Sequence, residues 1–228
     1  MSYEGSDLNQ FIFINTELAT TPLVPEIQLY LLKSESDLWR AFDPESMASD
    51  IQRPYWAFAW SGGQSLARYL LDNPDLAKGK RILDFGSGCG ITAIAAAKTG
   101  AASVLASDID PVAIRAITMN GRINGVDVDT CCEDLIFSEN RGWDLILAGD
   151  IWYTTRLSRH GLNWLRKFVD EGCEVLAADP GRQFSPSRGL KPLTTYSARS
   201  VPDVEHPGFQ EVVVSRVLPS EDPADAFF

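Results

Sequence analysis

Short apolar runs alternate with amphipathic stretches through the middle of the chain. The apolar runs predict buried strands near residues 80–84, 103–107, 127–132, 143–148 and 173–178. Apolar positions at helical spacing predict helices near 91–99, 111–123 and 155–170. Strands that alternate with helices form a parallel sheet covered on both faces. The pattern therefore predicts an α/β fold with a mostly parallel sheet.

The alternation ends near residue 180. Residues 180–191 are rich in Gly, Pro, Ser and Arg and predict a loop, and 192–201 and 209–218 follow as predicted strands. Because no long helix separates these two strands, we expect an antiparallel hairpin at the edge of the sheet. Residues 220–228 are expected to form a disordered tail.

The first quarter of the chain follows a different pattern. Residues 11–14 predict a short edge strand, 25–42 predict one or two amphipathic helices, and the polar stretch 43–53 predicts a loop. An aromatic segment, 54–63, then leads into a predicted helix over 64–72. We accordingly divide the chain into a helical extension (1–53), an α/β domain (54–219) and a tail (220–228).

The first chemistry lies in a glycine turn after the first predicted central strand. Gly86, Gly88 and Gly90 form G-x-G-x-G rather than the G-x-G-x-x-G that holds a dinucleotide pyrophosphate, and Asp84 precedes them. A carboxylate there would repel a pyrophosphate but suits a cation. S-adenosylmethionine (SAM) carries a sulfonium and an ammonium and has no phosphate. The turn favours SAM, and the alternative is a merely tight turn.

Further acids follow the other predicted strands and place a negative rim at one edge of the sheet. Asp108 ends the second strand, where an acid can accept hydrogen bonds from ribose hydroxyls. The alternative role, capping the helix that begins near Pro111, suits Asp110 better. Asp179 ends the fifth strand, and the segment 179–182 is either a substrate-facing loop or a structural turn.

Asp134 follows the third strand and is predicted to contact the adenine amino group. Leu135 and Ile136 would offer an apolar wall, and the neighbouring Glu133 could replace Asp134 in this role. Trp143 begins the fourth strand and is expected to pack in the core rather than stack on the cofactor.

The fourth strand ends at Gly149, beside Asp150 and Tyr153. Methyl transfer is a direct displacement, so an enzyme chiefly aligns the nucleophile. A lysine acceptor is protonated at neutral pH, with a pKa of ~10.4, and a carboxylate can steer its ammonium. We predict that role for Asp150, while Tyr153 supplies a hydroxyl or walls the channel. The alternative is a buried turn with Tyr153 in the core.

Composition narrows the partners and the compartment. The chain has 20 Lys and Arg against 31 Asp and Glu, and the net charge of −11 disfavours nucleic acid as the primary partner. No apolar run reaches the ~18 residues that span a membrane. Four cysteines without C-x-x-C spacing and two histidines predict no metal site and reduced thiols, and Cys131 and Cys132 are expected to pack unbridged in a strand. With no transit peptide predicted, the expected compartment is the cytoplasm and the expected state is a monomer.

These motifs together resemble a known family. Asp150-x-x-Tyr153, the Leu83–Gly90 turn and the aromatic segment around Trp60 are similar to the seven-β-strand protein-lysine methyltransferases. Within that group the chain is most similar to the electron-transfer flavoprotein β-subunit lysine methyltransferases, in a bacterial form, over residues 50–185. The matching runs are 54–57, 60–74, 83–97, 108–111, 149–150 and 179–182. The resemblance implies a Rossmann-like, seven-stranded SAM-dependent methyltransferase fold.

The resemblance and the spacing together give a set of expected site residues. The cofactor set is Trp60, Asp84, Gly86, Ser87, Gly88, Gly90, Asp108, Ile109, Asp134, Leu135 and Gly149, and the catalytic pair is Asp150 and Tyr153. Tyr55, Trp56 and Phe58 either line the same site or bury the extension. The predicted function is SAM-dependent methylation of lysines on the flavoprotein β subunit. The alternatives are a small-molecule N-methyltransferase with a nicotinamide-like acceptor and a SAM-binding module without catalysis.

Overall fold

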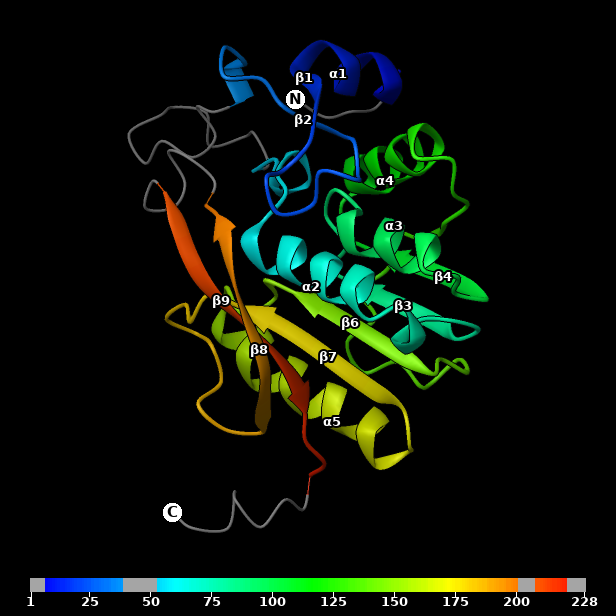
Figure 1. The fold of residues 1–228 in the computed structure, drawn as a ribbon, viewed down its shortest axis with the longest axis vertical. Helices are drawn as coiled ribbons and strands as arrows, with labels where there is room; N and C mark the ends of the chain where they lie inside the picture. Colours follow the sequence, from blue (N-terminus) through cyan, green and yellow to red (C-terminus); the bar gives the residue numbers. More distant parts are fainter. Residues whose placement is uncertain (1–6, 39–52, 201–207, 221–228) are drawn as a thin grey trace.

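A seven-stranded sheet forms the centre of the molecule, with helices on both faces (Figure 1). The computed structural model describes residues 7–38, 53–200 and 208–220. The strand order is β5-β4-β3-β6-β7-β9-β8. These strands are β3 (Arg81–Phe85), β4 (Ser103–Ser107), β5 (Asp129–Cys131), β6 (Leu145–Gly149), β7 (Glu174–Asp179), β8 (Leu190–Arg199) and β9 (Phe209–Val217).

Strands β3 to β7 pair in parallel, and β9 is antiparallel to both β7 and β8. The chain runs from β3 out to β5 and then crosses to β6 on the other side of β3. The strand order therefore reverses between β3 and β6. Ligands of open α/β sheets bind at the carboxyl ends of the strands beside such a reversal.

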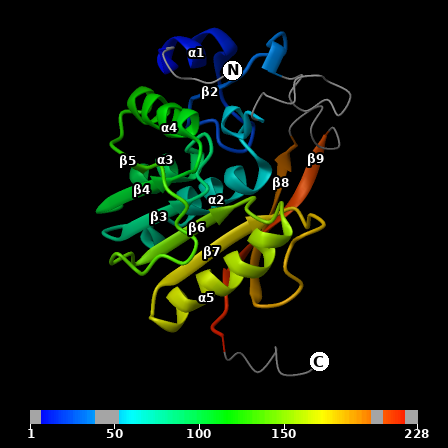
Figure 2. The ribbon, with the colours of Figure 1, turned by 180° about the vertical axis from the view of Figure 1, so that it is seen from behind.

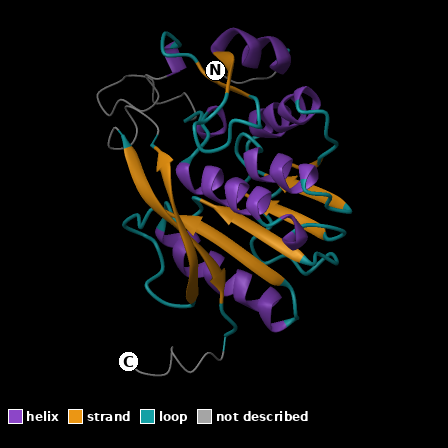
Figure 3. Ribbon diagram, viewed as in Figure 1, coloured by secondary structure: helices purple, strands orange, loops and turns teal. Residues whose placement is uncertain are grey.

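Alternation within the strands divides the core between the two faces of the sheet. Ile82 and Leu147 belong to the cluster that packs under α2 (Ser61–Asp72) and α3 (Ile91–Lys98). Leu83 and Ile146 belong to the opposite cluster, against α5 (Leu162–Asp170). In the view of Figures 1 and 3, α2 and α3 lie in front of the sheet, and in the reverse view of Figure 2, α5 lies in front of it. Trp143 lies in the α5 cluster, 6.0 Å from the Phe168 ring, which confirms its predicted core position.

The central elements confirm the sequence prediction. All five predicted parallel strands are present to within a few residues, and the late strands form the expected antiparallel hairpin. The helix over 111–123 is α4 (Pro111–Ile123), while the predicted 155–170 helix divides into a π-helical turn (Leu157–Gly161) and α5. Helix α2 begins at Ser61 rather than at residue 64, so both glycines of the aromatic segment lie in its first turn.

The prediction was wrong for the N-terminal segment. Residues 11–14 lie in α1 (Leu8–Asn15), where the Asp7 carboxylate accepts a hydrogen bond from the Asn9 N–H at 2.9 Å and caps the helix. Residues 29–32 form β2 (Leu29–Leu32), paired antiparallel with β1 (Thr16–Ala19). Tertiary pairing decides both elements, and the short apolar runs carry no clear period. The loop predicted at 43–53 and the tail lie almost wholly outside the described residues, and the domain boundary at 53 stays a prediction.

Buried Asn120 on α4 fastens this N-terminal segment to the rest of the fold. Its side-chain oxygen accepts a hydrogen bond from the Tyr30 N–H at 2.8 Å, and its side-chain nitrogen donates to the Cys89 carbonyl at 2.8 Å. One amide thus joins β2, α4 and the glycine turn. Ile12 and Trp56 complete the contact in a small apolar cluster against α4.

Replacing Asn120 by Ala should lower the free energy of unfolding by about 2 to 4 kcal/mol, because a buried N–H and a buried carbonyl both lose their partner. Chemical denaturation measures the loss. Thr118→Ala, on the same helix, removes a hydroxyl that bonds only to the Ile114 carbonyl and serves as the control. Equal unfolding midpoints for Asn120→Ala and the wild type would contradict this role.

Candidate active site

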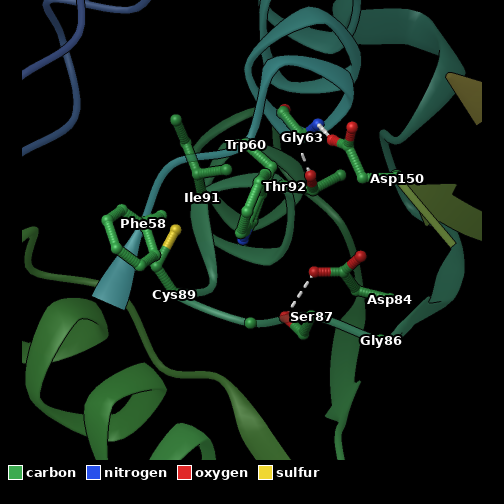
Figure 4. A pocket seen from close by; sticks show the side chains of 12 residues that line it. Phe58, Trp60, Gly63, Asp84, Gly86, Ser87, Cys89, Ile91, Thr92 and Asp150 are labelled. Atoms are coloured by element: carbon green, nitrogen blue, oxygen red, sulfur yellow. Dashed lines mark hydrogen bonds between the residues drawn. The ribbon is translucent and has the colours of Figure 1, made fainter. Parts of the chain in front are cut away.

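A pocket opens at the carboxyl ends of β3 and β6, where the strand order reverses (Figure 4). Its walls come from the segment before α2, the glycine turn, the start of α3 and the end of β6. Of the residues predicted from the sequence, those that line it are Trp60, Asp84, Gly86, Ser87, Gly88, Gly149 and Asp150. The residues predicted from the sequence therefore include both the glycine turn and the end of β6.

The glycine turn is held from beneath by the Asp84 carboxylate. That carboxylate accepts hydrogen bonds from the Ser87 hydroxyl and, at 3.0 Å, from the Ala93 N–H at the start of α3. Asp84 is buried, and burial raises its pKa to about 7. Its observed partners are therefore the turn and the helix, which organise the backbone that faces the pocket.

Gly88 is the open point of the turn. Its φ is +56°, and a Cβ built there would meet no atom within 4 Å, so its backbone borders free space. A Cβ at Gly90 would instead lie 3.3 Å from the Ile117 side chain, so Gly90 packs against α4 and is absent from the pocket wall. An uncluttered backbone at Gly88 fits the close approach of a cofactor without phosphate.

Asp108 and Asp110 divide the two roles predicted for the end of β4. Asp110 caps α4, accepting from the Val112 N–H at 2.8 Å. Asp108 accepts from the Gly88 N–H and from the Asp110 N–H, each at 3.0 Å, and burial raises its pKa. Asp108 therefore fixes the glycine turn relative to β4, and Ile109 beside it is 64% exposed.

The segment after β5 differs from the prediction. Asp134 is exposed and forms an ion pair with Arg156 at 2.8 Å, and Glu133 is engaged with Arg141 at 3.1 Å. Leu135 is only 1% exposed and packs in the α5 cluster with Ile136. These two side chains therefore pack in the core, and the apolar wall beside the adenine stays a prediction. Ile109 after β4 and Phe137 after β5 have exposed apolar side chains.

Asp150 follows β6 in the left-handed backbone region, with φ +56°. Its Oδ2 accepts a hydrogen bond from the Gly63 N–H at 2.9 Å, as drawn in Figure 4. Helix α2 receives no side-chain cap from its own N-cap residue, Trp60, so the Asp150 carboxylate caps this helix from a neighbouring strand. Burial raises the pKa of Asp150 to about 6, against the lowering effect of Arg182.

The fit between α2 and the sheet depends on Gly62. A Cβ at Gly62 would collide with the Ala178 carbonyl oxygen on β7 and with the Asp150 carboxylate. A Cβ at Gly149 would lie 3.0 Å from the Gly63 nitrogen. The sequence reading placed these two α2 glycines in the aromatic segment and missed their role. A Gly-Gly pair in a helix's first turn was the available signal.

Arg182 lies in the segment 179–182, and the sequence alone assigned it no role of its own. Its Nη1 pairs with the Asp150 carboxylate and lies 3.4 Å from Oδ2 of Asp179. Its guanidinium carbon lies 5.7 Å from the centre of the Trp60 ring. Asp179 accepts from the N–H groups of Gly181 and Arg182 at 2.7 and 2.9 Å. The segment 179–182 therefore forms a turn, and its Arg182 contacts two residues of the pocket wall, Trp60 and Asp150.

Aromatic side chains form one wall beside this charged group. Tyr55 lies 5.8 Å from the ring centres of both Trp60 and Tyr153, and Phe58 lies 5.5 Å from Trp60. Tyr153 is 50% exposed, which excludes the alternative that placed it in the core. Trp56 is buried beneath α1 and α4 and belongs to the fold rather than to the pocket.

The cysteines and the possible metal ligands were also predicted from the sequence. All four cysteines are free, and Cys132 is exposed rather than packed in a strand as predicted. Within residues 7–38, 53–200 and 208–220, no cluster of three or more His, Cys, Asp and Glu could hold a metal ion. In the same part of the chain no helix combines the length and apolar character needed to cross a membrane.

Comparison with known proteins adds a family to this geometry. The family described as ribosomal protein L11 methyltransferase (PrmA) matches residues 65–151. An electron transfer flavoprotein beta subunit lysine methyltransferase from Xenopus laevis is 44% identical over 210 residues, covering 90% of this chain and 84% of the relative. The Homo sapiens protein of that name is 44% identical over 188 residues, covering 81% and 71%. This chain belongs to the electron transfer flavoprotein beta subunit lysine methyltransferase family.

As a member of this family, the chain is a SAM-dependent protein-lysine methyltransferase. A solved structure of magnesium protoporphyrin IX methyltransferase from Synechocystis PCC 6803, with bound SAH, superposes with a TM-score of 0.51 at 14% identity. The match covers 79% of this chain and 93% of that one. Together with the strand order, it confirms the Rossmann-like methyltransferase fold.

Gly62→Ala should lower the free energy of unfolding by about 1 to 3 kcal/mol and reduce methyl transfer, because an added methyl group forces α2 away from β6 and β7. Denaturation and a methyl-transfer assay measure both effects. Gly161→Ala is the matched control, since its Cβ would lie at an ordinary 3.6 Å from Trp152. Unchanged stability and activity in Gly62→Ala would show that the close approach is unimportant.

Proposed function

We propose that this enzyme transfers methyl groups from SAM to lysine side chains of the electron transfer flavoprotein beta subunit. The observation that carries the proposal is the similarity to enzymes named for that activity, at 44% identity over 90% of this chain. The acidic pocket end supports a cationic acceptor, and the net charge of −11 disfavours nucleic acid. The cytoplasm is the proposed compartment because all four cysteines are free.

The proposed cofactor site is the groove along the glycine turn. We assign the backbone of Gly86, Ser87 and Gly88 to cofactor contact, because Gly88 borders open space. Asp108 would accept hydrogen bonds from the ribose hydroxyls. Its carboxylate already accepts two backbone N–H groups, and a carboxylate offers about four acceptor positions, so capacity remains.

The ends of this groove would hold the rest of the cofactor. Exposed Asp134 and Ile109 border the proposed adenine end. Trp60 and Gly149 line the opposite end, beside Asp150. The methyl group of the bound cofactor would then lie next to the buried carboxylate of Asp150.

Asp150 is the proposed catalytic residue because it lies at the acceptor end of the pocket. SAM supplies an electrophilic methyl group on a sulfonium. The carboxylate of Asp150 would draw in the lysine ammonium and hold the remaining amine hydrogens once a proton has left. The aromatic rings of Tyr55, Trp60 and Tyr153 would cover one side of an entering amine, and desolvation lowers the pKa of an amine. These residues thus orient the nucleophile.

The alternative, a small-molecule amine acceptor, would need an enclosed acceptor pocket. The aromatic wall is instead open at its outer edge, where Tyr153 is 50% exposed and Tyr55 is 41% exposed. A side chain carried by a protein can enter from that edge. The open rim therefore favours a protein acceptor over a nicotinamide-like molecule.

Gly88→Val should weaken SAM binding at least about tenfold, because the added side chain occupies the open face of the turn. Titration calorimetry on the folded variant measures the affinity. Gly79→Val is a close control: Gly79 also has positive φ, with no atom within 4 Å of its Cβ, but lies away from the pocket. The assignment fails if Gly88→Val and Gly79→Val bind SAM equally well.

The substrate is tested by incubating enzyme, SAM and recombinant flavoprotein and measuring intact masses. We expect gains of about 14 Da per methyl group on the beta subunit. Asp150→Asn keeps an acceptor for the Gly63 N–H while removing the charge, so it should bind SAM normally and lose turnover about 100-fold.

Two results would oppose these assignments. Efficient methylation of free nicotinamide with no mass gain on the beta subunit would favour the small-molecule alternative. Wild-type turnover in Asp150→Asn would remove Asp150 from the catalytic role, whatever the substrate.

A further inference from the structure

Two nearly buried carboxylates share one guanidinium at the acceptor end of the pocket. Asp150 follows β6 and Asp179 ends β7, and each side chain is 8% exposed. Arg182 Nη1 pairs with Oδ1 of Asp150 and lies 3.4 Å from Oδ2 of Asp179. The three side chains together carry one unit of net negative charge when both carboxyls are ionised.

The guanidinium of Arg182 is held by its own loop. Oδ1 of Asp179 accepts the Gly181 N–H, the Arg182 N–H and the Ser185 hydroxyl, which folds the chain back over the end of β7. The Trp60 ring lies 5.7 Å from the guanidinium carbon, within the range of a cation–π contact. Arg182 is thus fixed by backbone hydrogen bonds, a carboxylate and an aromatic ring.

The groups around Asp150 determine how strongly the Arg182 guanidinium affects the pKa of the Asp150 carboxyl. Burial raises the pKa of Asp150, and Asp179 raises it further, while Arg182 and the Gly63 N–H lower it. Helix α2 presents that backbone N–H to the carboxylate. The Cys89 thiol on the glycine turn is neutral, since burial raises its pKa to about 12. Among the residues that the structure describes, Arg182 is therefore the cation that opposes neutralisation of Asp150.

We propose that Arg182 is a positioning residue for methyl transfer, which keeps the Asp150 carboxylate ionised and fixed in direction while leaving one net negative charge for the acceptor ammonium. This inference rests on the proposed function of Asp150. The 179–182 turn then has a chemical role, because it holds the Arg182 guanidinium against Asp150.

Arg182→Met removes the charge and keeps an unbranched side chain, whereas Arg182→Lys restores a cation. Arg216→Met is the matched control, because Arg216 forms an ion pair with Glu174 at the other end of β7. Each variant is first checked for thermal unfolding and SAM affinity. The Asp150 carboxyl pKa is then read from a ¹³C NMR titration, with Asp150→Asn assigning the signal.

In Arg182→Met we expect the pKa of Asp150 to rise by about one to three units, as for a carboxylate that loses a neighbouring cation. Because the ionised form is required, the rise of turnover with pH should move upward by a similar interval. Loss of activity should be greatest at low pH. Deprotonation of the acceptor lysine contributes equally in all variants, so the difference between profiles reports on the enzyme. Arg182→Lys should restore most of the wild-type profile, and Arg216→Met should match the wild type.

An unchanged Asp150 titration in folded Arg182→Met would overturn the inference, as would an equal loss of turnover at every pH. The titration needs no substrate, so it is decisive even if the flavoprotein is not the acceptor. Failure of wild-type enzyme to methylate the beta subunit would instead contradict the proposed substrate alone.

Discussion

The carboxylate of Asp150 is the constraint on which the architecture of the pocket depends. Its backbone N–H donates to the Ala178 carbonyl on β7 at 2.9 Å, and its side chain caps α2 through Gly63 and pairs with Arg182. A non-glycine residue with φ +56° is costly, by about 1 to 2 kcal/mol, and persists where surrounding contacts over-determine it. A strand, a helix and a loop all fix this one residue. The site's geometry is therefore set by the packing of the whole sheet edge.

The central fold could be predicted because its signals are local. Alternating apolar strands and helical spacing gave β3 to β7 and the helices between them, since both periods follow from backbone geometry. The N-terminal segment could not be predicted in this way. Residues 29–32 form a strand because β1 lies beside them, and α1 is stabilised by packing against α4. Neither partner is visible in the short apolar runs themselves.

The same division separates the site residues. Gly86 and Gly88 follow from one local motif, and Asp108 follows from its position at the end of the next strand. Arg182 lies 32 residues from Asp150 in the sequence and meets it only because β6 and β7 are neighbours. The burial of Leu135 could not be predicted for a related reason: adjacent positions in an irregular segment can face either the core or the surface, and no period decides between them.

Two hydrogen-bonded groups with separate tasks emerge at this sheet edge. The glycine turn is held by Asp84 and Asp108, whose partners are the Ser87 hydroxyl and backbone N–H groups of the turn and the following helices. The acceptor end is held by Asp150 and Asp179 through Arg182. The two groups have no acid in common, and the start of α2 is hydrogen-bonded to Asp150 in the second group. A change in acceptor charge can therefore leave the proposed cofactor turn intact. Such independence lets one methyltransferase scaffold keep its cofactor turn while the chemistry of its acceptor varies.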